Sequence, residues 1–324
     1  MKTRLACGLI GAICVMALAA AASDHSERAS FHGVDYVSLS GWAERHHYKI
    51  RPSGVGEAVE LTRDKSRVVF ERDSNFGSIN GVNVFLSWPV AFLNGAAYAA
   101  VLDVQTVLDP ILFPRASSMP RFTTICIDAG HGGKDPGSLA GVAQEKRLTL
   151  LLAQEVANEL KSEGFKVVLT RKSDTFVEKP DRPAVANQKR AGLFVSLHYN
   201  SSDDTGVNGV ETYCLTPPGA VSTNAHGEGA PAGPAPANAH DRENLLAAYY
   251  IQRSVVREMG MKDRGLHRAR FAVLKPLAMP GVLVEGGFLT NPVEMRHICD
   301  ARYRQKMARA VVDGILAYAG ARAR

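Results

Sequence analysis

The sequence predicts an α/β fold, in which a mixed, largely parallel sheet is flanked by helices on both faces and is preceded by a small α+β domain. Three observations support this prediction. From Arg121 onward, short apolar runs alternate with longer segments whose apolar residues have helical spacing. Such alternation is typical of parallel strands joined by crossover helices. Before residue 115, strand-like alternation and an Asn-Gly turn predict a separate, β-rich unit.

Residues 1–23 have the composition of a secretory signal peptide. Lys2 and Arg4 precede the apolar run Leu5–Ala22, which ends in small residues. A membrane anchor is the alternative interpretation. No later apolar run reaches the roughly 20 residues of a membrane helix. We therefore expect an extracytoplasmic protein, periplasmic or secreted to the cell wall, with no membrane insertion after signal cleavage.

The charge and the cysteine count narrow the function classes. The 324 residues carry a formal net charge of +6, and two of these charges leave with the signal peptide. A mild basic excess suits binding to an anionic polymer such as the cell wall. Nucleic acid is not expected as a partner, because the sequence has no arginine-rich run interleaved with aromatic residues. Cys126, Cys214 and Cys299 match no metal motif. Cys126 and Cys214 fall in strand patterns and are expected to be buried thiols. One disulfide among the three cysteines is the alternative.

Residues 31–115 are predicted to form the small α+β domain. Residues 37–43 have helical spacing, and residues 58–62 and 67–71 alternate like strands. Residues 78–86 contain Asn-Gly between β-branched residues, which predicts a hairpin. Three prolines mark the linker that follows: Pro110, Pro114 and Pro120.

The second domain is predicted to span residues 120–320. Its predicted strands are Phe122–Ile127, Phe165–Thr170, Leu193–Leu197, Gly209–Leu215, a strand near Phe271–Leu274, and Gly281–Glu285. Its predicted helices are Lys146–Ser162, Arg182–Arg190, Asp241–Met259 and Tyr303–Tyr318. The segment Thr216–Ala239 is rich in Pro, Gly and Ala, so we expect a mobile surface insertion that lines or overhangs the site.

Three predicted strands of this domain end in ionisable groups. His131 follows the first strand inside a glycine-rich turn, His198 ends the strand that begins at Leu193, and Glu285 ends the strand that begins at Gly281. In open α/β sheets, ligands bind at the carboxyl ends of the strands. Two imidazoles and a carboxylate at that edge predict a metal site with a catalytic base.

A catalytic zinc usually takes three protein ligands from His, Glu and Asp. His131 and His198 are the first two candidates. The third is expected to be a carboxylate, and Glu145 fits best because it stands immediately before the long helix. Asp128 and Glu211 are the alternatives, and Asp128 is also a candidate for orienting a ligand or capping the turn.

Glu285 is the predicted catalytic residue. A metal lowers the pKa of water toward about 7, and a neighbouring carboxylate then takes a proton and returns it to the leaving amine.

The glycine-rich loop is not a phosphate-binding P-loop, because Asp128 occupies the first glycine position and Asp135 the hydroxyl position. A kinase or ATPase is therefore not expected, and the chain also lacks the His-Glu-x-x-His zinc protease motif.

Together these motifs resemble one family, the zinc-dependent N-acetylmuramoyl-L-alanine amidases of the amidase-3 type. The resemblance covers about residues 122–318 and rests on "IDAGHGGKDPGS", "EK", "LTR", "AN", "LFVSLHYNS", "GVET", "RGL" and "VLVEGGFLTNP", in the family's order. It implies a Zn²⁺ ion bound by His131, Glu145 and His198, with Glu285 as the catalytic acid and base.

The same resemblance assigns supporting residues and a reaction. Asn200 is a motif residue that shapes the site or contacts substrate, and Arg171 and Arg182 match family positions that serve packing or salt bridges. The implied reaction is hydrolysis of the amide between N-acetylmuramic acid and L-alanine in peptidoglycan. A regulatory protein partner stays open. The alternatives are a non-catalytic wall-binding protein on this scaffold and a metal-dependent hydrolase of another amide.

Two further points follow from resemblance. Some family members place an autoinhibitory helix over the zinc at the position of Thr216–Ala239, but here five prolines and four glycines disfavour such a helix. The run "INGVNVFLSWPVAFLNGAAY" resembles the small N-terminal domain of copper amine oxidases, which also precedes some bacterial wall enzymes, and no chemistry is carried over from it.

Overall fold

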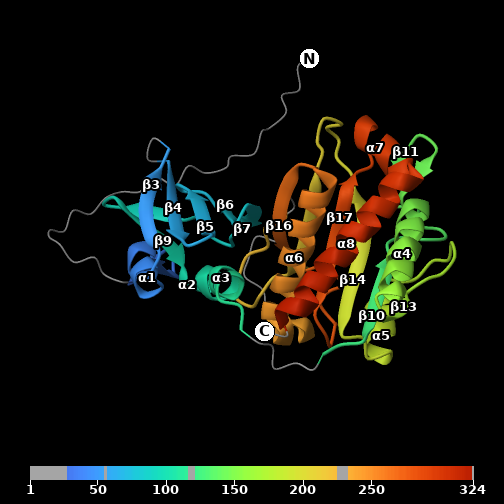
Figure 1. The fold of residues 1–324 in the computed structure, drawn as a ribbon, viewed down its shortest axis with the longest axis horizontal. Coiled ribbons are helices and arrows are strands. Elements are labelled where there is room, and N and C mark those ends of the chain that lie inside the picture. Colours follow the sequence, from blue (N-terminus) through green and yellow to red (C-terminus); the bar gives the residue numbers. More distant parts are fainter. Residues whose placement is uncertain (1–27, 55–56, 116–120, 225–232, 323–324) are drawn as a thin grey trace, which may run out of the picture.

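The computed structural model describes residues 28–54, 57–115, 121–224 and 233–322 (Figure 1). The predicted signal peptide, residues 1–23, lies outside the described residues. Within the described residues, no helix combines the length and apolarity needed to cross a membrane.

The N-terminal unit consists of short strands and helices. The hairpin predicted around Asn80-Gly81 is confirmed, with both residues in the left-handed conformation that such a turn requires (φ 51° and 80°). The elements of this unit are β1 (Arg28–Phe31), β2 (Val34–Ser38), α1 (Leu39–Arg45), β3 (Lys49–Ser53), β4 (Ala58–Arg63), β5 (Ser66–Glu71), β6 (Phe76–Ile79), β7 (Val82–Phe85), β8 (Ala91–Leu93), β9 (Ala96–Ala100), α2 (Val101–Asp103), the π-helical turn Val104–Leu108 and α3 (Asp109–Leu112).

The C-terminal unit alternates strands and helices, as the spacing predicted. Its elements are β10 (Thr124–Ala129), β11 (Leu139–Ala140), β12 (Ala143–Gln144), α4 (Glu145–Ser162), β13 (Lys166–Leu169), α5 (Asp181–Gln188), β14 (Leu193–Asn200), β15 (Val210–Leu215), the 3₁₀ turn Pro236–His240, α6 (Asp241–Met259), β16 (Asp263–Ala269), β17 (Gly281–Phe288), α7 (Pro292–Cys299) and α8 (Ala301–Arg322).

One mixed sheet runs through both units, in the order β13-β10-β14-β17-β15-β16-β7-β6-β5-β4-β3. The first four strands are parallel, β15 is antiparallel to β17, and β16 pairs in parallel with β7 of the N-terminal unit. At that junction Leu266 lies opposite Val84, and the Asn83 amide donates to Asp263 Oδ2 at 2.8 Å. Strand pairing between β7 and β16 therefore joins the strands of the N-terminal unit to those of the C-terminal unit (Figure 1).

Helices cover both faces of the C-terminal part of the sheet, as predicted. Ile125 and Ile127 point into a core shared with α4, α6 and α8, because alternate residues of a strand face opposite sides. Cys126 and Phe194 point the other way and pack with Ala186 of α5. The expectation of buried thiols holds, since Cys126 and Cys214 are buried; both are free, as is the exposed Cys299.

In the C-terminal unit, one predicted strand is wrong and one helix was missed. The strand near Phe271–Leu274 is a turn, in which the Leu274 amide donates to Phe271 O at 2.9 Å. The real strand is β16, whose charged residues concealed it: Arg268 is fully buried and donates from Nη2 to Thr106 O at 2.6 Å. The unpredicted helix is α7, capped by Asn291, whose side chain accepts from the next backbone amides.

The segment Thr216–Ala239 differs from the expected mobile surface insertion where it is described. Thr216, Ala220 and Ser222 are buried, and the Thr223 amide donates to Arg268 O at 2.8 Å. Residues 225–232 lie outside the described residues. Residues 216–224 are therefore anchored beside β16 rather than loosely exposed.

Helix α6 lies close against α8 at Gly314. A Cβ atom at this position would lie 2.6 Å from Ile251 Cα and 3.0 Å from Tyr250 O, both backbone atoms. The missing side chain is therefore what lets the two helices pack against each other.

We predict that Gly314→Ala destabilises the protein by about 1–3 kcal/mol, because the added methyl group must push α6 and α8 apart. Gly320→Ala in the same helix is the control, since nothing lies within 4 Å of a Cβ there. That change should leave stability unchanged or raise it by up to about 1 kcal/mol. Urea unfolding of the full chain measures both, and equal midpoints for the two variants would contradict the packing role.

Candidate functional site

His131 lies on the turn that follows β10, in a backbone conformation that side-chain-bearing residues seldom adopt. Its φ is +60°, a left-handed value that costs roughly 1–2 kcal/mol outside glycine. The neighbouring Gly130 leaves room for the second histidine, because a Cβ there would lie 2.3 Å from His198 Cε1. The turn therefore needs external contacts to hold it in place.

Two buried arginines supply those contacts. Arg171 donates from Nε to Ala129 O at 2.9 Å and from Nη2 to Gly130 O at 2.8 Å. Arg182 donates from Nη1 to Ala129 O at 2.7 Å and from Nη2 to His131 O at 2.8 Å. Together the two side chains bind every carbonyl oxygen from Ala129 to His131.

Asp128 sits beneath this turn and balances the charge of Arg182, whose Nη1 lies 2.8 Å from Asp128 Oδ1. The Asp128 carboxylate is fully buried and also accepts from Thr170 Oγ1 at 2.6 Å and Ser196 Oγ at 2.7 Å. With its oxygens engaged in this way, Asp128 supports the turn through Arg182, and it is not part of the candidate metal cluster.

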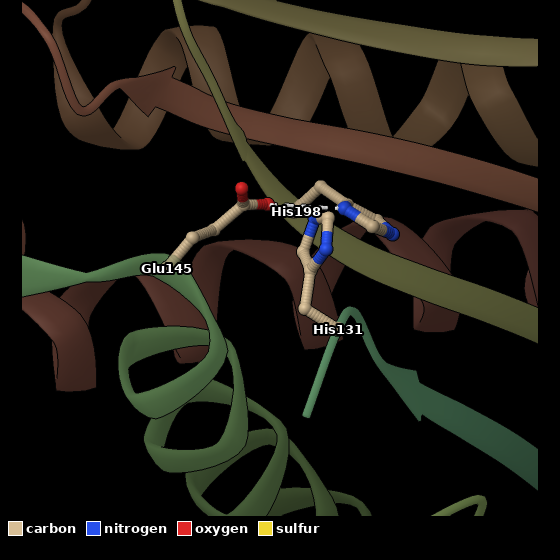
Figure 2. A group of neighbouring side chains, drawn as sticks. All are labelled: His131, Glu145 and His198. Carbon is tan, nitrogen blue, oxygen red and sulfur yellow. Dashed lines mark hydrogen bonds and ion pairs between the residues drawn. The ribbon is translucent and has the colours of Figure 1, made fainter. Parts of the chain in front are cut away.

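Glu145, the first residue of α4, meets both histidines (Figure 2). Its Oε1 lies 3.1 Å from His131 Nε2 and 3.1 Å from His198 Nδ1. The backbone amides of Ser138 and Tyr199 donate to the same carboxylate at 2.8 and 3.1 Å. These contacts fix a nearly buried carboxylate at the point where the two imidazoles converge.

Glu145 and His131 shift each other's pKa values. Burial alone would raise the pKa of the Glu145 carboxyl, but the hydrogen bonds from His131 and His198 lower it below its ordinary value. Burial lowers the pKa of His131, and the opposing contact with Glu145 raises it above its ordinary value. Glu145 therefore stabilises positive charge at the point where the two imidazoles converge.

The donor set fits a divalent metal ion. The ligand atoms of His131, Glu145 and His198 all lie within 4.8 Å of one another. Two imidazoles and one carboxylate are a typical protein ligand set for a catalytic zinc. His131 Nδ1 also lies 2.9 Å from Asp135 Oδ2, the kind of outer contact that orients metal-bound histidines. Sequence reasoning missed this role of Asp135, although an aspartate four residues after the histidine in a tight turn was a usable signal.

Glu285 lies on β17 beside His198, its partner in the parallel pairing of β14 and β17. It lines a pocket of about 920 Å³ together with His131 and His198. Its Oε2 is buried and has no hydrogen-bond partner among the described residues. Burial, followed by the charges of Glu145 and Glu211, raises the pKa of the Glu285 carboxyl well above its ordinary value.

Glu211 and Asn200 form a separate cluster behind Glu285. Glu211 accepts from Arg264 Nε at 2.5 Å, from Tyr213 Oη at 2.6 Å and from Asn200 Nδ2 at 3.0 Å. These bonds engage the carboxylate that the sequence left open as a metal ligand. Asn200 does not line the pocket and contacts Glu211 instead.

The pocket walls come from two loops. Phe176, Val177 and Pro180 form one wall, and Phe271 and Val273 form the other. The described part of the segment Thr216–Ala239 does not line this pocket. The sequence did not mark Phe176, Val177 and Pro180 as wall residues, and it assigned Phe271 and Val273 to a strand, whereas they lie in a turn.

Comparison with known proteins identifies the family. The family model described as N-acetylmuramoyl-L-alanine amidase matches residues 125–317, more than half of the chain. LytC of Bacillus subtilis (strain 168), an N-acetylmuramoyl-L-alanine amidase, is 34% identical over 195 residues, which cover 60% of this chain but only 35% of that relative. The amidase AmiA of Escherichia coli (strain K12) is 30% identical over 228 residues, 63% of this chain and 79% of the relative.

A solved structure supports the same assignment. The N-acetylmuramoyl-L-alanine amidase from Clostridium difficile 630 is 30% identical in sequence and superposes with a TM-score of 0.52, covering 61% of this chain and 97% of that one. The residues matched by the family model, 125–317, include His131, Glu145, His198 and Glu285. The chain therefore belongs to the Amidase_3 family of N-acetylmuramoyl-L-alanine amidases.

Proposed function

We propose that this chain is a zinc-dependent peptidoglycan amidase that hydrolyses the amide between the lactyl group of N-acetylmuramic acid and L-alanine of the stem peptide. The observation that carries the proposal is the placement of His131, Glu145 and His198 in one cluster beside the buried carboxylate of Glu285. Family membership supports the same chemistry, and several relatives are named as amidases of this kind.

His131, Glu145 and His198 are the residues that we propose to hold the zinc ion. When bound, zinc supplies Lewis acidity, which polarises a carbonyl oxygen and makes water more acidic. Glu145 contributes the negative charge of the set, and the amides of Ser138 and Tyr199 keep its carboxylate oriented. Asp135 holds the His131 ring through Nδ1, which leaves Nε2 facing Glu145.

Glu285 is the proposed acid and base. Its buried, unpartnered Oε2 is free to accept a proton from the attacking water and then to donate that proton to the departing nitrogen of L-alanine. The raised pKa of the carboxyl favours the first transfer, because the conjugate base of a weaker acid is a stronger base, and it keeps the proton on Glu285 until the amine can accept it. The products are a lactyl carboxylate on the glycan and a free amino group on the stem peptide.

The cellular setting stays part of the proposal. We propose that residues 1–23 are a signal peptide and that the mature protein acts outside the cytoplasm on the cell wall. Residues 31–115 are proposed as an N-terminal domain that resembles the small domain of copper amine oxidases, and residues 120–320 as the catalytic domain. Cell-wall remodelling or daughter-cell separation is the corresponding role.

We predict that a chelator abolishes peptidoglycan hydrolysis and that added zinc restores it. His198→Ala should lower the zinc content of the purified chain, because one of three protein ligands is lost. His297→Ala on α7 is the control, since that exposed histidine lies outside the cluster. Elemental analysis and dye release from labelled peptidoglycan measure the two effects, and full zinc content in His198→Ala would contradict the ligand set.

We predict that Glu285→Gln keeps the zinc ion but lowers turnover by about 10²–10⁴-fold, the usual contribution of general acid–base catalysis. Glu71→Gln, at an exposed carboxylate on β5, should retain both. Mass spectrometry of the digest tests the bond that is cut, because only this amidase reaction leaves a free N-terminal L-alanine. Loss of zinc in Glu285→Gln would instead assign Glu285 to the ligand set.

If the wild-type protein binds peptidoglycan and zinc but releases no product, the non-catalytic alternative holds. If it releases products without a free L-alanine terminus, it hydrolyses a different amide.

A further inference from the structure

We propose that Lys134 forms a carboxylate-binding subsite at the mouth of the catalytic pocket and that this subsite recognises an acidic residue of the stem peptide. The proposal rests on the proposed amidase function and adds a specificity determinant to it. Lys134 is exposed and lines the same pocket as His131 and Glu285.

The backbone around Lys134 is held rigidly. Gly132 and Asp135 form an isolated β-bridge, with backbone hydrogen bonds of 2.9 and 3.1 Å between them, which places Lys134 inside a closed turn. The Gly133 amide donates to Asp174 Oδ1 at 2.7 Å, and Lys146 Nζ donates to Gly133 O at 2.8 Å. The same turn carries His131, so the position of Lys134 is tied to the metal cluster.

The Lys134 side chain has an aromatic support but no counter-ion. Its Nζ lies 4.3 Å from the centre of the Phe176 ring, which forms part of the pocket wall. Within the described residues it forms no ion pair. The neighbouring Lys146 shows the contrast, because its Nζ is paired with Asp174 Oδ2 at 2.7 Å. A cation that is held by a ring and lacks a carboxylate partner can bind an anion from the substrate.

Apart from Glu285, the proposed acid and base, the other charged groups that line the pocket have a neighbour of opposite charge. Asp135 contacts His131, and the charge of Arg182 is balanced by Asp128. Glu178 and Lys179 are adjacent, exposed and of opposite sign, so their charges offset at the outer rim.

The chemistry of the substrate supplies the matching group. The second residue of a stem peptide is D-isoglutamate, whose α-carboxylate is free in some cell walls and a carboxamide in others. Two extended residues span at most about 7 Å, so this group stays close to the scissile amide. Lys134 is therefore expected to favour substrates that carry the free carboxylate.

The test compares two soluble muramoyl peptides that differ only in that group, D-isoglutamate or D-isoglutamine, with the full zinc-loaded chain. Lys134→Met keeps the apolar contact with Phe176 and removes the charge, Lys134→Arg keeps the charge, and Lys189→Met alters an exposed lysine outside the pocket. We expect Lys134→Met to raise KM about fivefold for the acidic peptide only, with kcat unchanged. Lys134→Arg should preserve the preference, and Lys189→Met should not affect it.

The outcomes separate this proposal from the proposed function. Absence of product from both peptides with the wild-type chain would overturn the amidase function itself. Cleavage of both peptides with the same KM in the wild-type chain, or an equal rise in KM for both in Lys134→Met, would overturn the subsite while leaving the amidase function intact.

Discussion

Two buried guanidinium groups hold the turn on which the whole site depends. The carbonyl oxygens of Ala129, Gly130 and His131 accept hydrogen bonds from Arg171 and Arg182, and Gly130 O also accepts from Thr149 Oγ1 at 2.8 Å, so the turn would lose most of its side-chain donors without the two arginines. The contacts offset the strain of the left-handed His131 backbone and set the direction of its ring. Asp128 at the end of β10 completes the arrangement by neutralising Arg182 in the core.

The surroundings of two glutamates in the same site shift their carboxyl pKa values in opposite directions. Glu145 receives hydrogen bonds from two imidazoles and two backbone amides, so its negative charge is stabilised. The Oε2 atom of Glu285 is buried and has no hydrogen-bond partner among the described residues, and the charges of Glu145 and Glu211 lie nearby, so the neutral form of Glu285 is favoured. The different surroundings of the two carboxylates suit Glu145 to the role of metal ligand and Glu285 to the role of proton carrier. Other enzymes that use paired carboxylates show the same pattern.

The continuous sheet gives the N-terminal unit a fixed place beside the catalytic strands. The junction at β16 and β7 is reinforced by stacking of His267 on Phe85, whose ring centres are 4.2 Å apart. His267 also stacks with Tyr213 at 5.2 Å, and Tyr213 donates to Glu211 behind the site. A contiguous row of packed side chains therefore connects the N-terminal strands with the cluster that faces Glu285.

The sequence by itself determined the alternating α/β order and the position of His131 just after a strand, because apolar periodicity and glycine-rich turns are local signals. It predicted that His198 and Glu285 end their strands, whereas β14 continues to Asn200 and β17 to Phe288. It could not identify β16, since charged Arg264 and Arg268 concealed a central strand whose burial depends on contacts with distant residues. It favoured Glu145 as the third ligand and kept Asp128 and Glu211 as alternatives. Only the tertiary structure separates these two alternatives from the cluster, because hydrogen bonds from Arg182, Arg264 and Tyr213 engage their carboxylates, whereas Glu145 faces the histidines.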